Sequence, residues 1–202
     1  IDVATRQRTG LWQVPGCASL YGIAVDRYGH VWLGNYSCHD VLRFDPQTET
    51  WARFSVGRGN SRGMAANAEG EVFVAVDNTN QVYKFDAATG ENLGIYSVGQ
   101  SGVIGIALDD ESFVWTVARN SQLASKMSSD GVLVGHYPVG RAPYTYSDMT
   151  GQALRTFAAP VGIYRLAYES SCKYGTVWGP IDIEAETPAG TAIEVRLSLA
   201  DA

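Results

Sequence analysis

Three consecutive stretches of this sequence resemble one another closely. They are GIAVDRYGHVWLGNYSCHDVLRFDPQTETWARFSVG at residues 22–57, GMAANAEGEVFVAVDNTNQVYKFDAATGENLGIYSVG at residues 63–99 and GIALDDESFVWTVARNSQLASKMSSDGVLVGHYPVG at residues 105–140. Their first glycines are 41 residues apart (22 to 63) and then 42 residues apart (63 to 105). A repeat of about 40–45 residues is the period of a four-stranded propeller blade. We therefore expect an all-β fold built of β-propeller blades of about 41 residues.

Each repeat contains four short runs rich in β-branched and aromatic residues, separated by polar turns, which predicts four antiparallel strands. Asp26 and its counterpart Asp109 begin the first turn, where we expect an aspartate to cap the backbone rather than to bind calcium. One blade cannot bury both faces of its sheet, so blades must stack on one another. In the first repeat the strands are predicted at Gly22–Val25, His30–Gly34, Val41–Phe44 and Trp51–Val56.

Large aromatic residues recur at one place in the second predicted strand. They are Trp32, Phe73 and Trp115. Large aromatic side chains usually serve core burial. We expect them to pack between blades, and the alternative is a site where a substrate stacks on them.

The predicted propeller spans residues 1–159, as a half blade, three full blades and a second half blade. Residues 1–14 align with the third and fourth strands of a blade, and Tyr144–Gly151 aligns with the start of one. Two interpretations remain open: the two halves close a four-bladed ring, or the chain is a segment of a larger ring. After Pro160 the period is lost, and residues 160–202 predict part of a β-sandwich-like domain.

Composition excludes two classes of function. The chain of 202 residues has a net charge of −6 and an isoelectric point near 5.0, which disfavours nucleic-acid binding because phosphate contacts need a surplus of Lys and Arg. No apolar run is long enough to predict a membrane span. We expect neither a nucleic-acid partner nor a membrane span.

The positions of two cysteines predict a disulfide. Cys17 lies in the connection that enters the first repeat, and Cys38 lies in the loop between its second and third strands. Because antiparallel strands alternate in direction, these two segments open on the same face of a propeller. A Cys17–Cys38 disulfide is expected, and it places the protein in an oxidising, extracytoplasmic compartment, whether secreted, periplasmic or at the cell surface. Cys172 is left without a partner in this scheme.

We call this face, where the blade-to-blade connections meet the loops between second and third strands, the upper face. It collects most of the candidate binding residues, because loops on a rigid scaffold commonly bind ligands and arginine forks suit anionic groups. The alternative is that these residues are solvated loop charges that bind no ligand. The candidates are Arg58, Arg62, Arg119 and Arg141, together with Asn35, His39 and Asp77. The expected partner is a protein or an anionic or carbohydrate ligand.

Catalytic motifs are not evident. The three histidines, His30, His39 and His136, fall on different parts of the predicted blades, so no two are expected to share a metal ion. The sequence contains no HExxH or CxxC pattern. The residues GNSRG at 59–63 match GxSxG as a string, but no helix is predicted after them, so they do not form the strand-to-helix elbow that carries a catalytic serine. We therefore predict no catalytic residues, no metal site and no cofactor.

The repeat pattern G-I/M-A-x-D/N-x-x-G-x-V-W/F, followed by V-x-R/K-F-D-x-x-T-G and F-x-V-G, resembles the virginiamycin B lyase (streptogramin lyase) family and the related NHL and gluconolactonase-like propellers. The resemblance covers about residues 9–151. The segment Pro143–Gly151, with the residues after it, also looks similar to large secreted or surface propeller proteins of bacteria such as myxobacteria.

The resemblance implies a propeller fold, and in the lyases glutamate and histidine residues at the mouth of the ring work with a magnesium ion. A glutamate there often stands three positions after the second-strand tryptophan. The corresponding residues here are Asn35, Val76 and Ala118, so the lyase chemistry cannot be transferred to any residue of this chain.

Three functions follow as hypotheses. The first is an extracytoplasmic binding or interaction module without catalytic activity of its own. The second is a magnesium-dependent, streptogramin-lyase-like enzyme whose catalytic residues lie outside this segment. The third is a structural component of an envelope or extracellular assembly, in which another chain completes the sandwich.

Overall fold

The computed structural model describes residue 2, residues 5–145 and eight isolated positions between 179 and 195. The chain divides into two units, Ile1–Gly162 and Ile163–Ala202, and the fold below belongs to the first. The half blade predicted around residues 144–158, the sandwich predicted for residues 160–202, and Cys172 lie outside the well-described segment 5–145. The division into 1–159 and 160–202 therefore stays a prediction.

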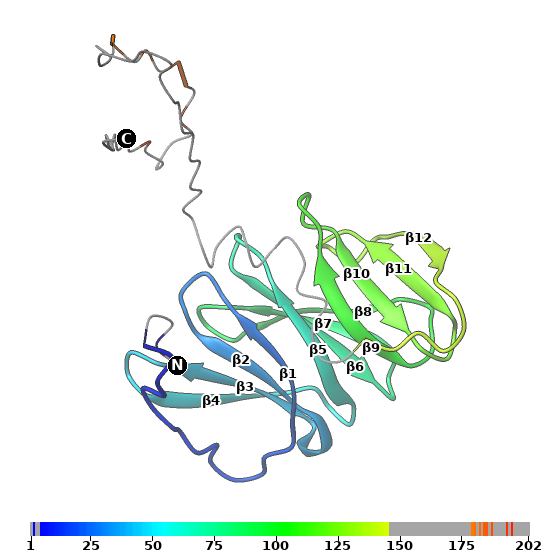
Figure 1. Cartoon of the computed structure of the whole chain (residues 1–202). Helices are drawn as coiled ribbons and strands as arrows, with labels where there is room; N and C mark the ends of the chain where they lie inside the picture. The colour runs from blue at the N-terminus through cyan, green and yellow to red at the C-terminus, as the bar shows by residue number, and fades with distance from the viewer. Residues whose placement is uncertain are drawn as a thin grey trace. The chain divides into compact units, whose positions relative to one another are not determined.

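Three four-stranded antiparallel sheets make up the described segment (Figure 1), and within each sheet the strands pair in sequence order. The propeller-type, all-β fold predicted from the repeat is confirmed. The only helical element between residues 5 and 145 is a short 3-10 turn, η1 (Tyr36–Cys38). The first sheet comprises β1 (Leu20–Val25), β2 (Val31–Asn35), β3 (Asp40–Asp45) and β4 (Thr50–Ser55); the second comprises β5 (Asn60–Ala66), β6 (Glu71–Asp77), β7 (Gln81–Asp86) and β8 (Asn92–Ser97); the third comprises β9 (Val103–Leu108), β10 (Val114–Ala118), β11 (Leu123–Met127) and β12 (Leu133–Pro138).

The turn between the first two strands is built as the aspartates predict. Asp26 Oδ1 accepts hydrogen bonds from the backbone N–H groups of Tyr28 and His30, and Asp26 Oδ2 accepts one from Trp32 Nε1 at 2.8 Å. Asp109 repeats this arrangement in the third sheet, with Trp115 Nε1 at 2.9 Å. Burial would raise the pKa of Asp109, but the hydrogen bonds from Trp115 and Lys126 lower it overall. The capping aspartate thus also fixes the orientation of the second-strand tryptophan.

The cores of the propeller lie between neighbouring sheets. The first strand of each sheet contacts the first strand of the next, β1 against β5 and β5 against β9. The fourth strands β4, β8 and β12 are the most exposed. Trp32 is completely buried between the first and second sheets, and Phe73 is completely buried between the second and third. Packing of these aromatic residues between blades, as predicted from the repeat, is confirmed for both.

Close approach of the inner strands explains the glycine that begins the first repeat. A Cβ atom on Gly22 would lie 2.0 Å from the carbonyl oxygen of Arg62 on β5. Any side chain at this position would collide with backbone, which cannot move aside without shifting a neighbouring strand. Gly22 therefore sets the spacing of the first two sheets.

Removal of the buried indole should be costly. We expect Trp32→Ala to lower the free energy of unfolding by about 3–5 kcal/mol, because it leaves a cavity between two sheets. Leu11→Ala, at a residue that is 75% exposed, should change it by about 0.5 kcal/mol or less. Urea unfolding followed by circular dichroism measures both, and equal losses would contradict this assignment of the core.

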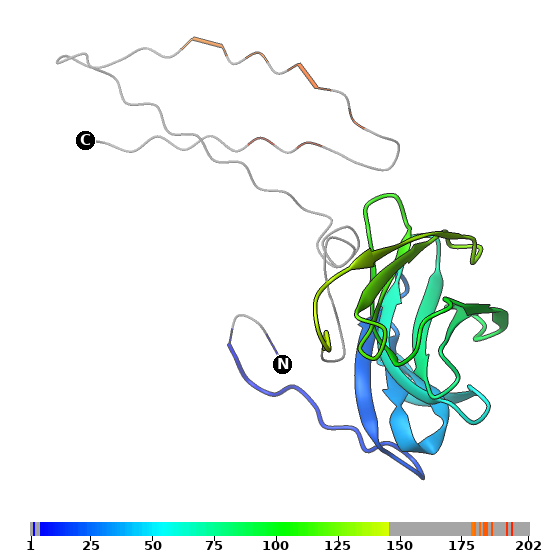
Figure 2. The same cartoon turned by 90° about the vertical axis from the view of Figure 1, so that its right-hand side faces the viewer.

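The chain that leads into β1 differs from its prediction. Residues 5–19 form no strand, although two strands were expected within residues 1–14 (Figure 2). A third strand is held along one edge by the second strand of its own blade, as β3 is by β2, and the described residues provide no such strand for this segment. Trp12 instead packs on Phe44 of β3, with ring centroids 5.2 Å apart, so this segment still covers an apolar surface of the first sheet.

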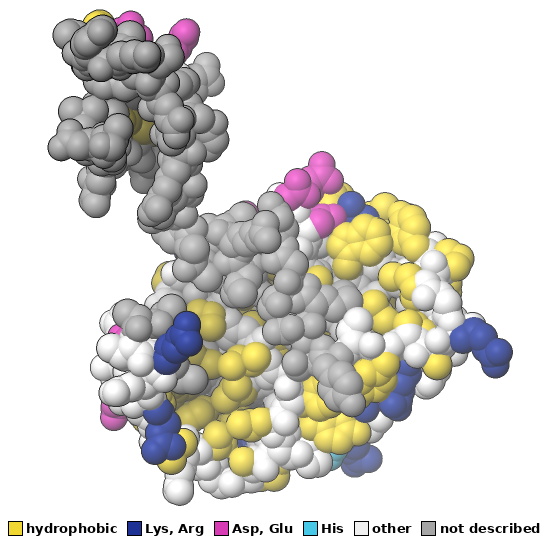
Figure 3. Space-filling view, in the orientation of Figure 1, with side chains coloured by type: hydrophobic (Ala, Val, Ile, Leu, Met, Phe, Trp, Pro, Cys, Tyr) yellow, Lys and Arg dark blue, Asp and Glu magenta, His cyan; other side chains and the backbone are white. Residues whose placement is uncertain are grey.

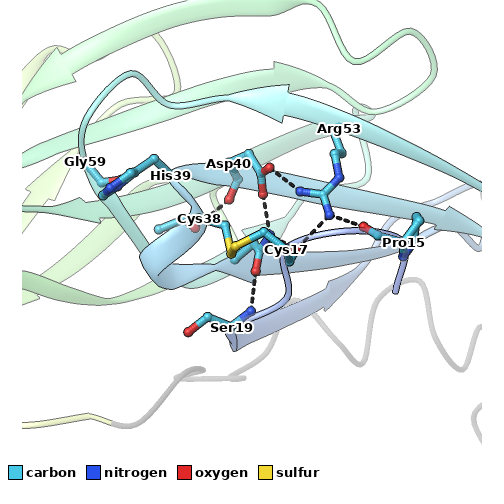
Figure 4. The surroundings of a disulfide bond; sticks show 10 residues. Pro15, Cys17, Ser19, Cys38, His39, Asp40, Arg53 and Gly59 are labelled. Carbon is cyan, nitrogen blue, oxygen red and sulfur yellow. Dashed lines mark hydrogen bonds and ion pairs between the residues drawn. A yellow bond between two sulfur atoms is a disulfide. The ribbon is translucent and has the colours of Figure 1, made fainter. Parts of the chain in front are cut away.

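A disulfide and a polar network attach this segment to the first sheet (Figure 4). Cys17 and Cys38 are bonded, with Cα atoms 6.0 Å apart, so the predicted disulfide is present in the structure. Arg53 on β4 donates to the backbone carbonyls of Pro15 and Cys17 and pairs with Asp40. The connection into β1 is thus held at its backbone as well as through sulfur.

We expect loss of the disulfide to destabilise the protein without unfolding it. A double Cys17→Ser, Cys38→Ser variant should lose about 3 kcal/mol, because the disulfide closes a loop of 21 residues that gains entropy in the unfolded chain. Thermal unfolding with and without reductant measures the difference. The double variant should be insensitive to reductant, and a wild-type protein equally insensitive would contradict the prediction.

Candidate functional site

The upper face forms where β1, β5 and β9 begin and where β2, β6 and β10 end. Hydrogen bonds between the two kinds of segment place them on one face. His39 Nδ1 lies 3.0 Å from the carbonyl oxygen of Gly59, and the Gly102 N–H donates to Asn80 Oδ1 at 2.8 Å. Connections and loops therefore meet as strand direction predicts.

Arg62, at the start of β5, is the centre of this face. Its side chain is only 6% exposed, and its guanidinium lies 5.0 Å from the ring centroid of Tyr21 and 4.6 Å from that of Tyr36. It also donates to the Tyr36 hydroxyl at 3.3 Å. The guanidinium is thus held against two aromatic rings, one from β1 and one from η1.

Asp77, at the end of β6, neutralises Arg62. Arg62 Nε donates to Asp77 Oδ2 at 2.8 Å, and Arg62 Nη2 lies 2.7 Å from the same oxygen. Burial alone would lower the pKa of Arg62, but the hydrogen bond and charge of Asp77 raise it overall. This buried pair joins the first blade to the second through the tyrosines.

Arg119 shares the same carboxylate from the third sheet's loop. Its Nη2 lies 3.7 Å from Asp77 Oδ2, and its side chain is 40% exposed. Its Nε is buried and has no hydrogen-bond partner among the described residues. One carboxylate therefore faces two guanidinium groups, so the three side chains together carry a net positive charge.

A third tyrosine, Tyr144, completes the cluster. The hydroxyl groups of Tyr21 and Tyr144 lie 2.5 Å apart. Burial raises the pKa of Tyr21, and the hydrogen bond with Tyr144 adds to the effect. A tyrosine hydroxyl can both donate and accept hydrogen bonds, so either oxygen can be the donor in this pair.

The remaining predicted site residues are placed differently. Asn35 is fully buried, accepts from the Ser19 N–H and donates to the Cys17 carbonyl and to Asp40, so its amide is committed to anchoring the chain before β1. His39 is exposed and bonds to Gly59. Arg58 and Arg141 are exposed in the blade-to-blade connections, as their sequence positions predict. Only Arg62, Asp77 and Arg119 of the predicted set lie in mutual contact.

Tyr21 was not predicted as a site residue, although the sequence contains a signal for it. Tyr21 and Arg62 each stand directly before the first glycine of a repeat, at Gly22 and Gly63. Equivalent positions in neighbouring inner strands come close together around a ring. Comparing these positions between repeats would have found the Tyr21–Arg62 contact.

Between residues 5 and 145 no three His, Cys, Asp or Glu side chains are grouped closely enough to bind a metal ion. None of the described residues belongs to a helix with the length and hydropathy to cross a bilayer.

The Arg62–Asp77 pair should contribute strongly to stability. We expect Asp77→Asn to lower the free energy of unfolding by about 3–5 kcal/mol, because it leaves the buried Arg62 charge uncompensated. Asp110→Asn, at an exposed aspartate in a turn, is the matched control and should have little effect.

A double-mutant cycle with Arg62→Met tests the same pair. The loss in the double variant should be smaller than the sum of the single losses by about 1–3 kcal/mol, because the two residues interact directly. Chemical unfolding measures all four proteins. Additive losses would contradict a direct interaction.

Comparison with known proteins supports the fold alone. No protein-family model matches the chain, and no curated protein matches its sequence. Among solved structures, the chain is similar to virginiamycin B lyase from Staphylococcus aureus, with a TM-score of 0.58, 12% identity and 63% of this chain covered. It is also similar to hydrazine synthase from Kuenenia stuttgartiensis (TM-score 0.58, 15% identity, 68% covered) and to the WD40 β-propeller domain of Doa1 (TM-score 0.53, 16% identity, 62% covered).

The matches cover less than half of each of these structures: 44%, 41% and 42% of their chains. The TM-scores, all above 0.5, establish a β-propeller fold of the kind found in virginiamycin B lyase and WD40 domains. The sequence identities, all below 20%, limit the conclusion to the fold. The NHL and myxobacterial likenesses remain predictions from the sequence motifs.

Proposed function

We propose that these blades act as a non-enzymatic, extracytoplasmic binding module, whose upper face binds an acidic protein or carbohydrate ligand through Arg119. The observation that carries the proposal is the sharing of Asp77 by two arginines. Arg62 Nη2 lies 2.7 Å from Asp77 Oδ2, whereas Arg119 Nη2 lies 3.7 Å from the same oxygen. The charge of Arg119, whose side chain is 40% exposed, is therefore incompletely neutralised. A carboxylate or sulfate on a ligand would supply the missing acceptor.

Other side chains of the upper face suit such a ligand. Tyr144 is 44% exposed and offers an aromatic face with a polar tip. Arg58 and Arg141, both exposed in connections of the upper face, add positive charge that would attract an acidic partner. Arg62 itself serves as the buried support of the site rather than as its contact.

The extracytoplasmic location rests on the disulfide. Structural disulfides persist in oxidising compartments and are rare in the cytosol. The Cys17–Cys38 disulfide joins the segment that leads into β1 to η1, so it supports the first blade and the Tyr21 side of the site. Peptide mapping of the protein isolated with its thiols blocked would test this location, and a reduced pair would argue against it.

Binding of acidic polysaccharides tests the site. We expect polygalacturonate or dextran sulfate to bind the full chain at low salt, and Arg119→Ala to weaken binding at least about tenfold by removing a charge-assisted hydrogen bond. Arg27→Ala is the matched control, because Arg27 is an exposed arginine in the turn between β1 and β2, at the opposite end of the strands. Isothermal titration calorimetry measures both, and equal affinities of the two variants would refute the site.

The alternative is a magnesium-dependent lyase whose catalytic residues lie outside this segment. It is favoured only by the similarity of fold to the virginiamycin B lyases. The positions where a lyase glutamate would be expected hold Asn35, Val76 and Ala118, which are all buried. We expect a longer polypeptide that includes this segment to leave streptogramin B antibiotics intact with Mg²⁺ present, and ring opening detected by mass spectrometry would revive this alternative.

A further inference from the structure

Each sheet turns one face toward the sheet that follows it in the chain, and we call this the forward face. On the first forward face, Trp32 lies 6.1 Å from Phe85 of the second sheet, between ring centroids. Phe73 occupies the same place on the second forward face and is buried against the third sheet. Trp115 occupies this place on the third sheet, but its aromatic neighbour is Tyr137 of its own sheet, at 5.2 Å.

A basic residue stands beside the aromatic residue on all three forward faces. Arg43 pairs with Trp32 in the strand register and donates to the carbonyls of Ala87 and Ala88, in the turn between β7 and β8 of the next sheet. Lys84 pairs with Phe73 in the strand register, and its ammonium lies 3.7 Å from the carboxylate of Asp130, in the corresponding turn of the third sheet.

Lys126 holds this position on the third forward face. It pairs with Trp115 in the strand register, and its ammonium lies 5.3 Å from the indole centroid. Its acidic neighbours are Asp109 at 2.9 Å and Glu111 at 4.0 Å, both within its own sheet. Lys126 thus repeats the arrangement of Arg43 and Lys84 without an acceptor from a following sheet among the described residues.

The fourth strands carry a third matching feature. The rings of Phe54 and Tyr96 each pack against a glycine in the turn between the third and fourth strands of the next sheet. A Cβ atom on Gly90 would lie 2.0 Å from Phe54, and one on Gly131 would lie 2.0 Å from Tyr96. Tyr137 is the equivalent aromatic residue of the third sheet and is 42% exposed.

The connection out of each sheet is the fourth matching feature. A valine followed by a glycine with positive φ ends each blade, with φ values of 70° at Gly57, 65° at Gly99 and 94° at Gly140. Val56 and Val98 are buried in the two cores between sheets, whereas Val139 is 46% exposed. The chain therefore leaves the third sheet by the same route that carries it from the first sheet to the second and from the second to the third.

We propose that the forward face of the third sheet, formed by Trp115, Lys126, Tyr137 and Val139, is the docking surface for a further blade that follows Gly140 in the same polypeptide. Hydrophobic side chains reach the surface over β10 and β11 in Figure 3. The two interfaces between described sheets indicate what this blade must offer. The turn between its third and fourth strands should bring an oxygen acceptor to Lys126, as the corresponding turns do for Arg43 and Lys84. The same turn carries a glycine under Tyr137.

Stability of two matched variants of the full chain tests the docking. Val139→Asp should lower the melting temperature by about 5 °C or more, because it would bury a charge under the added blade. Val132→Asp should lower it by about 2 °C or less, since Val132 is 66% exposed and its counterpart in the second sheet, Glu91, is an exposed acidic residue. Equal, small shifts would overturn the proposal.

Amine acylation of the wild-type chain gives a second test that needs no variant. Lys84 is the internal standard for Lys126, because it is buried, pairs with Glu71 of its own sheet at 2.6 Å and lies 3.7 Å from Asp130 of the next sheet. Acylation by an N-hydroxysuccinimide ester, followed by peptide mass spectrometry, compares the two rates at several protein concentrations. The proposal expects Lys126 to be protected to within about threefold of Lys84 at every concentration.

Two outcomes of the acylation experiment would overturn the proposal. If the acylation result and the melting temperatures of the variants disagree, the acylation result takes precedence. A rate for Lys126 more than about tenfold above that of Lys84 in the monomer would mean that the face is open. Protection that appears only at concentrations where sedimentation shows a dimer would mean that a second copy of the chain covers it.

Discussion

Packing of one sheet against the next is the interaction on which the rest of this structure depends. A single four-stranded blade has two faces to bury and no layer of its own to cover them. Trp32 between the first and second sheets, and Phe73 between the second and third, supply the buried aromatic surface. The capping aspartates act through the same contact, because Asp26 holds the Trp32 indole in place while it closes the adjacent turn.

This packing also creates the candidate binding site. Because the first strands β1 and β5 lie side by side, Tyr21 and Arg62 meet although they are 41 residues apart in the sequence. Asp77 and Arg119 then approach from the ends of the second strands of two blades. The site thus combines the buried Arg62–Asp77 ion pair with the half-exposed Arg119. The strands of the second sheet fix the ion pair, and the loop after β10 holds Arg119 at the surface.

The chain before β1 illustrates where prediction from the repeat was right and where it was wrong. The disulfide followed from strand direction alone, because two cysteines in segments that open on the same face can meet. The two strands expected within residues 1–14 did not form in the described part of that segment. Sequence similarity to a strand does not supply a hydrogen-bonding partner, and Trp12 instead packs on Phe44 by its side chain.

The period, the four strands of each blade, the turns and the burial of Trp32 and Phe73 could all be predicted from the amino-acid sequence, because each depends on local propensity and on a pattern that repeats. The sequence also placed Arg62, Asp77 and Arg119 on one face through strand direction. Which of the seven candidate residues touch could be seen only in the folded chain. Contacts between blades join positions far apart in the sequence, such as Tyr36 with Arg62 and Asp77 with Arg119, and they depend on the spacing of whole sheets. The same spacing assigned Asn35 to anchoring and brought Tyr21 to the arginine, because an inner strand is close to its neighbours only once the blades have stacked.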